Sequence, residues 1–343
     1  MDDTLIAIMA LLCEEDGLSD HRIGKQLQLG MSQLNRALAV LASSAEAGGL
    51  GWLTTRDDGK RRTLWLTDAG RQQCAAAPQP QTGAQQLPAL RIERGMATPL
   101  DECVAEETAV ALVYNGIAHA VMMASPQDLA DFALGFSLTE GIIAGPAELL
   151  DLDISAGADG VTVDMRILEQ RFHILKDVRR SLAGRTGCGL CGHESLASAI
   201  RPVARVDNPF ATPAADVSVA IAQLASLQPL NALTGATHAA GWWQGGTLTV
   251  REDVGRHNAL DKLVGAIARD TRRDGVLVMT SRASYEIVHK AAAANIGIVA
   301  AISAPTALAV QLAGEAGITL IGFARGERIT VYSHPQRIVC ESG

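Results

Sequence analysis

Hydrophobic positions in the first 74 residues repeat first with a helical period and then with a strand period. The helical segments are 5–12, 19–27 and 32–41, and the alternating segments are 52–56 and 62–66. Ser19 and Ser32 are good caps for the second and third helices. The sequence Asp57-Asp-Gly-Lys60 suits a hairpin turn between the two strands. Three helices followed by a hairpin predict a small winged helix-turn-helix domain over residues 1–74.

A stretch rich in Pro, Gln and Ala follows at residues 75–89 and shows no hydrophobic period. Such composition is typical of a linker. We therefore expect three regions: the small domain at 1–74, the linker at 75–89, and a larger domain at 90–343.

The larger domain changes from a hairpin pattern to a regular alternation of strands and helices. Asn115-Gly116 between two apolar runs predicts a β-hairpin, and a helix is expected over 126–140, with Pro126 in its first turn. The later strands are expected at 247–251, 275–281, 298–303, 318–324 and 328–332, and the later helices at 256–269, 284–295 and 306–316. This alternation predicts a largely parallel sheet with helices on its faces.

Polar residues follow several of these strands, where open α/β sheets bind their ligands. The arginines among them are Arg256, Arg282, Arg325 and Arg328. Arginines near helix N-termini suit a phosphate-rich ligand, so we expect a nucleotide there. Two alternatives stay open: Asp253 and Asn258 could serve only as helix caps, and His257 could be a core or capping histidine instead of an acid or base.

Cys188 and Cys191 form the one Cys-x-x-Cys of the chain, in a loop with glycines at 184, 187, 189 and 192. Glycines leave the backbone free to present both sulfurs to another molecule. A helix expected just beyond the loop would favour the thiolate form of Cys191. Because a structural zinc site takes four ligands, the pair would need a partner such as His193, His238 or His257. Sulfur handling through a cysteine persulfide is the interpretation we favour over zinc, a redox pair or a structural disulfide.

Composition narrows the classes of function. The 343 residues carry a net charge of −8, and aromatic residues make up 3%, so a general binder of single-stranded nucleic acid is not expected. The N-terminus has no basic segment followed by an apolar run, and no stretch reaches about 18 uninterrupted apolar residues. We expect a cytoplasmic protein with no membrane partner.

Five motifs together resemble the FdhD family over roughly residues 91–339. They are Phe136-Ser-Leu-Thr-Glu-Gly-Ile-Ile143, Cys188-x-x-Cys191, Glu252-Asp-Val-Gly-Arg-His-Asn-Ala-Leu-Asp-Lys262, Ser281-Arg-Ala-Ser-Tyr-Glu286 and Tyr332-Ser-His-Pro-Gln-Arg337. The resemblance implies a sulfurtransferase needed for formate dehydrogenase activity. It implies a three-layer α/β/α sheet domain similar to cytidine deaminases, and a homodimer.

The resemblance also implies roles and partners. Cys188 would carry the persulfide, received from a cysteine desulfurase, with Cys191 assisting. The acceptor would be the bis-molybdopterin guanine dinucleotide cofactor, which guanosine diphosphate would mimic, and the protein itself would need no metal. The residues expected to bind the cofactor are Phe323, Ala324, Arg325, Gly326, Glu327, Arg328, Arg256, His257, Ser281 and Arg282.

The small N-terminal domain is not part of this resemblance. Its third helix and the basic Lys60-Arg61-Arg62 segment could contact DNA, as in regulators of the MarR type, which its order of elements resembles. It could equally serve protein contact or dimerisation. Two other functions stay open for the whole chain. One is a transcription regulator that senses the molybdenum cofactor, and the other is a zinc-dependent hydrolase similar to deaminases.

Overall fold

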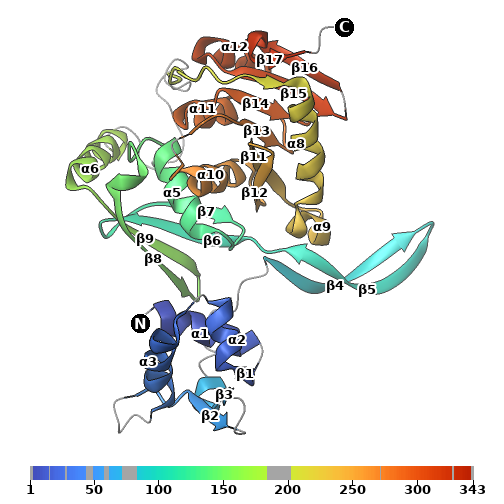
Figure 1. Cartoon of the computed structure of the whole chain (residues 1–343). Coiled ribbons are helices and arrows are strands. Elements are labelled where there is room, and N and C mark those ends of the chain that lie inside the picture. Colours follow the sequence, from blue (N-terminus) through green and yellow to red (C-terminus); the bar gives the residue numbers. More distant parts are fainter. Residues whose placement is uncertain are drawn as a thin grey trace. The chain divides into compact units, whose positions relative to one another are not determined.

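The chain divides into two compact units, residues 1–81 and 82–343, in the computed structural model (Figure 1). The structure describes residues 3–14, 16–27, 29–43, 49–57, 62–71, 83–183, 202–270, 272–326 and 328–340. Each unit has its own hydrophobic core. Among the described residues, no helix is both long and apolar enough to span a bilayer.

Within the described part of the N-terminal unit, the helices α1, α2 and α3 accompany a three-stranded sheet in the order β1-β3-β2, and a short helical segment follows at 68–71. Its elements are α1 (Asp3–Glu14), β1 (Leu18–Ser19), α2 (Asp20–Gln26), α3 (Met31–Ala42), β2 (Leu53–Asp57) and β3 (Arg62–Leu66). Ser19 caps α2 as predicted, since its side chain accepts from the Arg22 amide. The predicted Ser32 cap is wrong. The cap of α3 is Gly30, whose amide donates to the Gln33 side chain at 3.4 Å.

A six-stranded sheet in the order β12-β11-β13-β14-β15-β16 forms the largest layer of the second unit. Its strands are β11 (His238–Gln244), β12 (Thr247–Asp253), β13 (Val276–Met279), β14 (Ile298–Ala301), β15 (Thr319–Arg325) and β16 (Arg328–Ser333). Only β13–β14 and β14–β15 pair in parallel. The expectation of a largely parallel sheet is therefore wrong, because β11 pairs antiparallel between β12 and β13 and β16 returns antiparallel along β15.

Helices cover both faces of this sheet. The helices α10 (Arg256–Ile267), α11 (Tyr285–Ala293) and α12 (Ala307–Ala316) pack on one face through Leu260, Ile287 and Leu312. The helix α8 (Ala214–Ser226) packs on the other face through Val217 and Leu224. The short α9 (Pro229–Thr234) follows α8. Burial of both sheet faces explains the nearly continuous apolar runs of the central strands.

A second sheet has four strands in the order β7-β6-β9-β8, which come before the six-stranded sheet in the sequence. This sheet has its own helices. Its elements are β6 (Thr108–Tyr114), β7 (Ile117–Ala124), α5 (Leu129–Thr139), β8 (Leu149–Gly157), β9 (Gly160–Ile167) and α6 (Glu169–Ala183). The predicted hairpin at Asn115-Gly116 is confirmed. The helix predicted from 126 begins instead at Leu129, because Asp128 has a left-handed backbone with φ 54°.

The two sheets are joined where α5 crosses α10. A Cβ atom at Gly135 would overlap the Asp261 carbonyl, and one at Gly265 would overlap the Asp131 carbonyl. Only glycine permits backbones to approach this closely. The crossing therefore fixes α10, whose first residues were predicted to bind the ligand, against the second sheet.

A long hairpin precedes the four-stranded sheet. It consists of β4 (Ala84–Glu93) and β5 (Met96–Ala105), which pair along their whole length. Residues 84–89 were expected to belong to a linker and are instead strand. The remaining linker positions 75–82 lie outside the described residues.

Candidate functional site

The carboxyl ends of β12, β13, β14 and β15 share one edge of the six-stranded sheet, because these four strands run in the same direction. The predicted site residues follow these strands. Cys188, Cys191 and Glu327 lie outside the described residues. The remaining predicted residues form two groups on this edge, one after β12 and β13 and one after β15.

In the first group, Arg256 and His257 begin α10 beside His238, the first residue of β11. The carboxylate of Glu286, in the first turn of α11, lies 3.9 Å from His257 Nε2. Burial and then the Arg256 charge lower the pKa of His257, and the same two causes lower the pKa of His238. Both histidines are therefore biased toward the neutral form, beside a permanent cation.

Two buried atoms of this group, Arg256 Nε and His257 Nε2, have no hydrogen-bond partner among the described residues. Buried polar atoms are normally paired. Such atoms are suited to contact a ligand. A histidine that served only as a core or capping residue would be expected to pair this nitrogen, and His257 Nε2 has no such hydrogen bond among the described residues. Ser281 is buried and donates to the neighbouring Arg282 carbonyl at 3.1 Å, whereas the Arg282 side chain is exposed.

The acidic residues before Arg256 hold the backbone. Asp253 accepts hydrogen bonds from the amides of Ser125 and Gly255, and forms an ion pair of 2.7 Å with Lys262. Both side chains of this pair are fully buried. Burial lowers the pKa of Lys262, which Asp253 opposes. Asn258 donates to Asp253 at 3.0 Å. These contacts fix the turn between β12 and α10 and are structural.

A second buried network lies one turn further along α10 and was not predicted. Lys290 Nζ donates to Asp261, Glu140 and Thr139, each at 3.0 Å. Thr139 donates to Asp261 at 2.6 Å. Burial raises the pKa of Asp261 to about 6, although Lys290 opposes the rise. The network joins α5, α10 and α11. It therefore holds together the two helices, α10 and α11, that carry Arg256, His257 and Glu286.

The second group lies on the β15–β16 hairpin. Phe323, Arg325 and Arg328 are exposed there, and Arg325 faces Arg328 across the two strands. Phe323 has φ 51° at an irregularity of the pairing between Gly322 and Arg325. Gly326 has φ 55° in the turn, a conformation that glycine adopts without strain. The Ala324 side chain is buried in the core, so only its backbone is available to a ligand.

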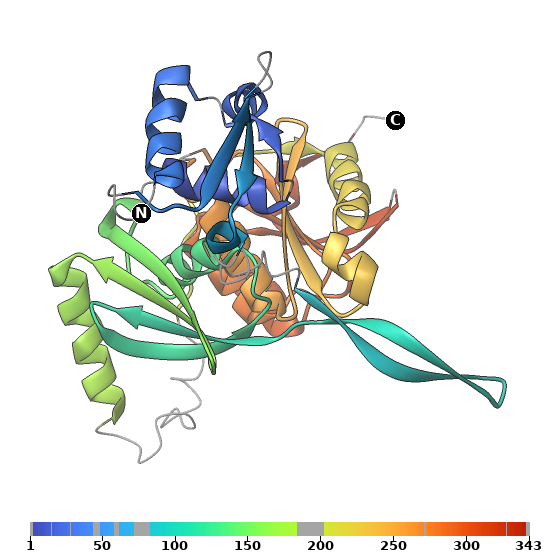
Figure 2. The same ribbon diagram turned by 90° about the horizontal axis from the view of Figure 1, so that it is seen from below.

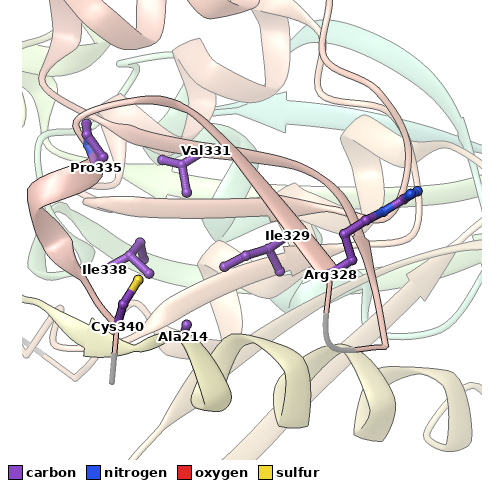
Figure 3. A pocket seen from close by; sticks show the side chains of 7 residues that line it. All are labelled: Ala214, Arg328, Ile329, Val331, Pro335, Ile338 and Cys340. Carbon is purple, nitrogen blue, oxygen red and sulfur yellow. The ribbon is translucent and has the colours of Figure 1, made fainter. Parts of the chain in front are cut away.

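A groove of about 610 Å³ lies on the outer side of this hairpin. It is lined by Ala214, Arg328, Ile329, Val331, Pro335, Ile338 and Cys340. Figure 3 shows the Ile329 side chain turned toward Ile338 across the groove, while the Arg328 side chain extends away from them. The groove offers apolar walls next to a cation.

The two groups do not form one small pocket. Arg256 follows β12, four strand spacings from β15, and Ser281 follows β13, two spacings from β15, or about 19 Å and about 10 Å. A ligand that contacts both groups must therefore span at least two strand spacings. Among the described residues, no group of three His, Cys, Asp or Glu side chains is placed to hold a metal ion.

In the N-terminal unit, Arg62 is one of the basic residues that would contact phosphates if this unit bound DNA. Its guanidinium forms an ion pair with Asp20 at 3.0 Å and donates to Asn35. These contacts use Nε and Nη2, and the Asp20 carboxylate offsets the charge of the guanidinium. Lys60 and Arg61 lie outside the described residues.

Comparison with known proteins relates the second unit to one family. The model of the FdhD/NarQ family matches residues 105–339. A sulfur carrier protein FdhD of Cupriavidus necator is 52% identical over 256 residues, which cover 74% of this chain and 89% of the relative. One from Bordetella bronchiseptica is 52% identical over 239 residues, covering 68% and 87%. The crystal structure of a protein assigned as a formate dehydrogenase accessory protein, from Desulfotalea psychrophila, has a TM-score of 0.59 and 27% identity, covering 75% of this chain and 99% of that one.

Proposed function

Because this chain belongs to the FdhD/NarQ family, we propose that it is a sulfur carrier that serves the maturation of a formate dehydrogenase. The observation that carries this proposal is the 52% identity over 256 residues to a sulfur carrier protein. Identity at this level over nearly the whole relative supports a shared activity. The carrier works in the cytoplasm with a cysteine desulfurase as its donor.

The proposed chemistry uses the thiolate of Cys188. The thiolate attacks the outer sulfur of a persulfide on the donor, a new S–S bond forms at Cys188, and the donor cysteine leaves as a thiolate. No oxidant is needed, because the sulfane sulfur only changes its partner. Cys191 assists this exchange as the neighbouring thiol. In the sequence, glycines at 184, 187, 189 and 192 surround the pair.

The proposed acceptor is the bis-molybdopterin guanine dinucleotide cofactor, bound along the sheet edge. Arg325 and Arg328 are exposed cations that suit a diphosphate, and the groove beside Arg328 offers apolar walls for a base. Arg256 and His257 lie far enough away to contact another part of so large a ligand. At this edge the Arg256 cation lies beside His257, whose pKa is lowered, and a cation suits the phosphates of the proposed cofactor.

Mass spectrometry of the intact chain tests the carrier function. After incubation with a cysteine desulfurase and cysteine, the protein should gain one sulfur, about 32 Da by elemental mass. Cys188→Ala should abolish the gain, while Cys340→Ala, which removes an exposed cysteine of the described part, should not. Undiminished loading in Cys188→Ala would contradict the assignment.

For the N-terminal unit we propose a winged helix, since its helices and its hairpin occur in the order typical of that motif. The pairing of Arg62 with Asp20 favours protein contact over DNA contact. A gel-shift titration with a promoter fragment should then show no binding that falls steeply with salt. Salt-sensitive binding that weakens in Arg62→Ala would support a regulator instead.

The layers of the second unit are consistent with the proposed cytidine-deaminase-like arrangement, and the family resemblance further supports a homodimer.

A further inference from the structure

The first group at the sheet edge includes His238, which was not predicted to bind the cofactor. His238 begins β11, whose amino end lies at the carboxyl ends of β12 and β13 because β11 runs antiparallel to both. Its half-buried ring lies within range of the Arg256 charge. A hydrogen bond of 2.9 Å from the Ala239 amide to Thr280 holds the start of β11 against the end of β13. Arg256, His257 and His238, the histidine–arginine cluster, therefore converge on one edge from α10 and β11.

Two helix N-termini lie at the same edge. The helices α10 and α11 follow β12 and β13, and neither capping residue, Gly255 or Ser284, makes a side-chain hydrogen bond to its helix. Uncapped amides of a first turn carry partial positive charge and suit an anion. The two helices are neighbours in both views of the chain (Figures 1 and 2), and the hydrogen bond from Lys290 to Asp261 joins them. The edge thus presents backbone donors beside the histidine–arginine cluster.

The charges that face the two histidine rings balance one another at neutral pH. Arg256 is a permanent cation, and the carboxylate of Glu286 lies 3.9 Å from His257 Nε2. Burial and then the Arg256 charge lower the pKa of His257, which Glu286 opposes, and the same two causes lower the pKa of His238. Lys290 of α11 also lowers the pKa of His257, while the carboxylates of the buried network offset its own charge. One cation, one anion and two neutral rings leave no surplus positive charge for a bound anion.

A bound anion would change this balance. Its charge would raise the pKa of a histidine beside it, because a nearby opposite charge favours the protonated form. His257 Nε2 and Arg256 Nε are buried atoms with no hydrogen-bond partner among the described residues, so neither has to break a hydrogen bond to meet the anion. A histidine that is neutral alone and charged beside its ligand takes up a proton when the ligand binds.

We propose that Arg256, His257 and His238 bind a doubly charged oxyanion, of the class of a phosphate group, and take up a proton from the solvent as it binds. Arg256 supplies the permanent charge, the rings supply the charge gained on binding, and the first-turn amides of α10 and α11 donate hydrogen bonds. The affinity for the anion then increases as the pH falls through the histidine pKa of the bound state. The inference rests on the proposed function for its occupant, because the proposed cofactor carries diphosphate groups.

An NMR titration of the histidine ring signals in the full chain tests the proposal. Sulfate is the probe, because it stays doubly charged over the whole pH range of the titration. Saturating sulfate should raise the pKa of His257 by at least about half a unit relative to sodium chloride of equal ionic strength, and the pKa of His238 should rise with it. The exposed His173 on α6 is the internal control and should not differ between the two salts.

Variants of the arginine test its part in the site. Arg256→Gln should remove most of the sulfate effect on His257, and Arg256→Lys, which keeps a cation, should restore part of it. Arg272→Gln removes an exposed arginine at the opposite edge of the sheet and should leave the effect unchanged. A pKa of His257 that sulfate does not change would overturn the proposal. An equal rise at His173 would also overturn it, since it would indicate general binding of sulfate to the surface.

The same titration with guanosine diphosphate identifies the source of the anion. A rise in the pKa of His257 with this nucleotide supports the site and assigns it to a nucleotide phosphate. A rise with sulfate alone supports the site and assigns it to a free oxyanion or to another anionic part of the cofactor. Persulfide loading of Cys188, measured separately, reports on the carrier function. Normal loading without any sulfate effect would reject this inference and leave the proposed function in place.

Discussion

The end of β12 and the end of β15 look alike in the sequence, because charged residues occur at both. In the structure the charged side chain at the end of β12 is buried, whereas those at the end of β15 are exposed. After β12, Asp253 is fully buried and its carboxylate contacts Lys262, Ser125 and Gly255. After β15, Arg325 and Arg328 are exposed, and Arg325 has one hydrogen bond, to the Ile302 carbonyl at 3.2 Å.

The comparison separates charges that shape the fold from charges that can meet a ligand. A buried ion pair with full hydrogen bonding cannot turn outward without leaving a charge in the core. Exposed arginines keep most of their hydrogen-bonding capacity for an anion. Arg256 and His257 lie between the two cases, because they are partly buried and have unpaired atoms at the sheet edge.

The largest expected effect comes from Asp253→Ala. It removes the counter-ion of the buried Lys262, which keeps only its hydrogen bonds to the Ser125 and Glu252 carbonyls, so we expect the free energy of unfolding to fall by about 3–5 kcal/mol. Denaturant titration of the full chain measures this. Asp159→Ala, at an exposed turn, should change it by less than about 0.5 kcal/mol. Equal effects of the two changes would contradict a structural role for the Asp253 carboxylate.

The next effect concerns binding. Arg325→Ala with Arg328→Ala should weaken guanosine diphosphate binding by about 2–4 kcal/mol, the scale of two charge-assisted hydrogen bonds, with unfolding nearly unchanged. Isothermal titration calorimetry measures the affinity. Arg272→Ala removes an exposed arginine before β13, at the opposite edge of the sheet, and serves as the control. Unchanged affinity in the double variant would place the ligand elsewhere.

The third prediction uses pH to test the buried network. The pKa of Asp261 is raised from 3.8 to about 6 by burial. The folded state therefore holds this proton more tightly than the unfolded state, and the stability from Asp261 is full below about pH 4 and is lost as pH rises through 6. Unfolding measured from pH 4 to 7 should show this loss in the unsubstituted chain and not in Asp261→Asn. Parallel curves would contradict a raised pKa.

The smallest effect is expected at the histidines. Arg256→Gln removes the second cause of the lowered pKa of His257 and His238, so both values should rise while burial still keeps them low. An NMR titration of the ring signals measures the change. The exposed His173 on α6 is the internal control and should not shift. A fall in either pKa would show that Arg256 does not face these rings.

Much of the second unit could be predicted from the sequence, because its helices have a clear apolar side and its strands are bounded by polar turns. Several strands were not predicted, and three of them show why. The strand β11 is buried on both faces and has no alternation to detect, whereas β4 and β5 are exposed on both faces and have none for the opposite reason. Periodicity reveals a strand only when its two faces differ.

The candidate site shows the same division. Sequence reasoning placed Arg256, His257, Arg325 and Arg328 after strands, and the structure puts them at one edge of the sheet. Sequence reasoning did not find the Asp261–Lys290–Glu140 network, whose members are far apart in the chain. Nothing short of the fold brings α5, α10 and α11 together, so no local pattern could predict that pairing.

At Phe323, the stability of the fold and the proposed contact with a ligand favour different residues. Its left-handed φ of 51° is unfavourable for a bulky residue and costs on the order of 1–3 kcal/mol, while its ring is 38% exposed and gains little from burial. Glycine at this position would remove the backbone strain and raise the free energy of unfolding. A selection for thermal resistance alone would therefore be expected to discard the aromatic ring, and a selection for cofactor maturation to retain it.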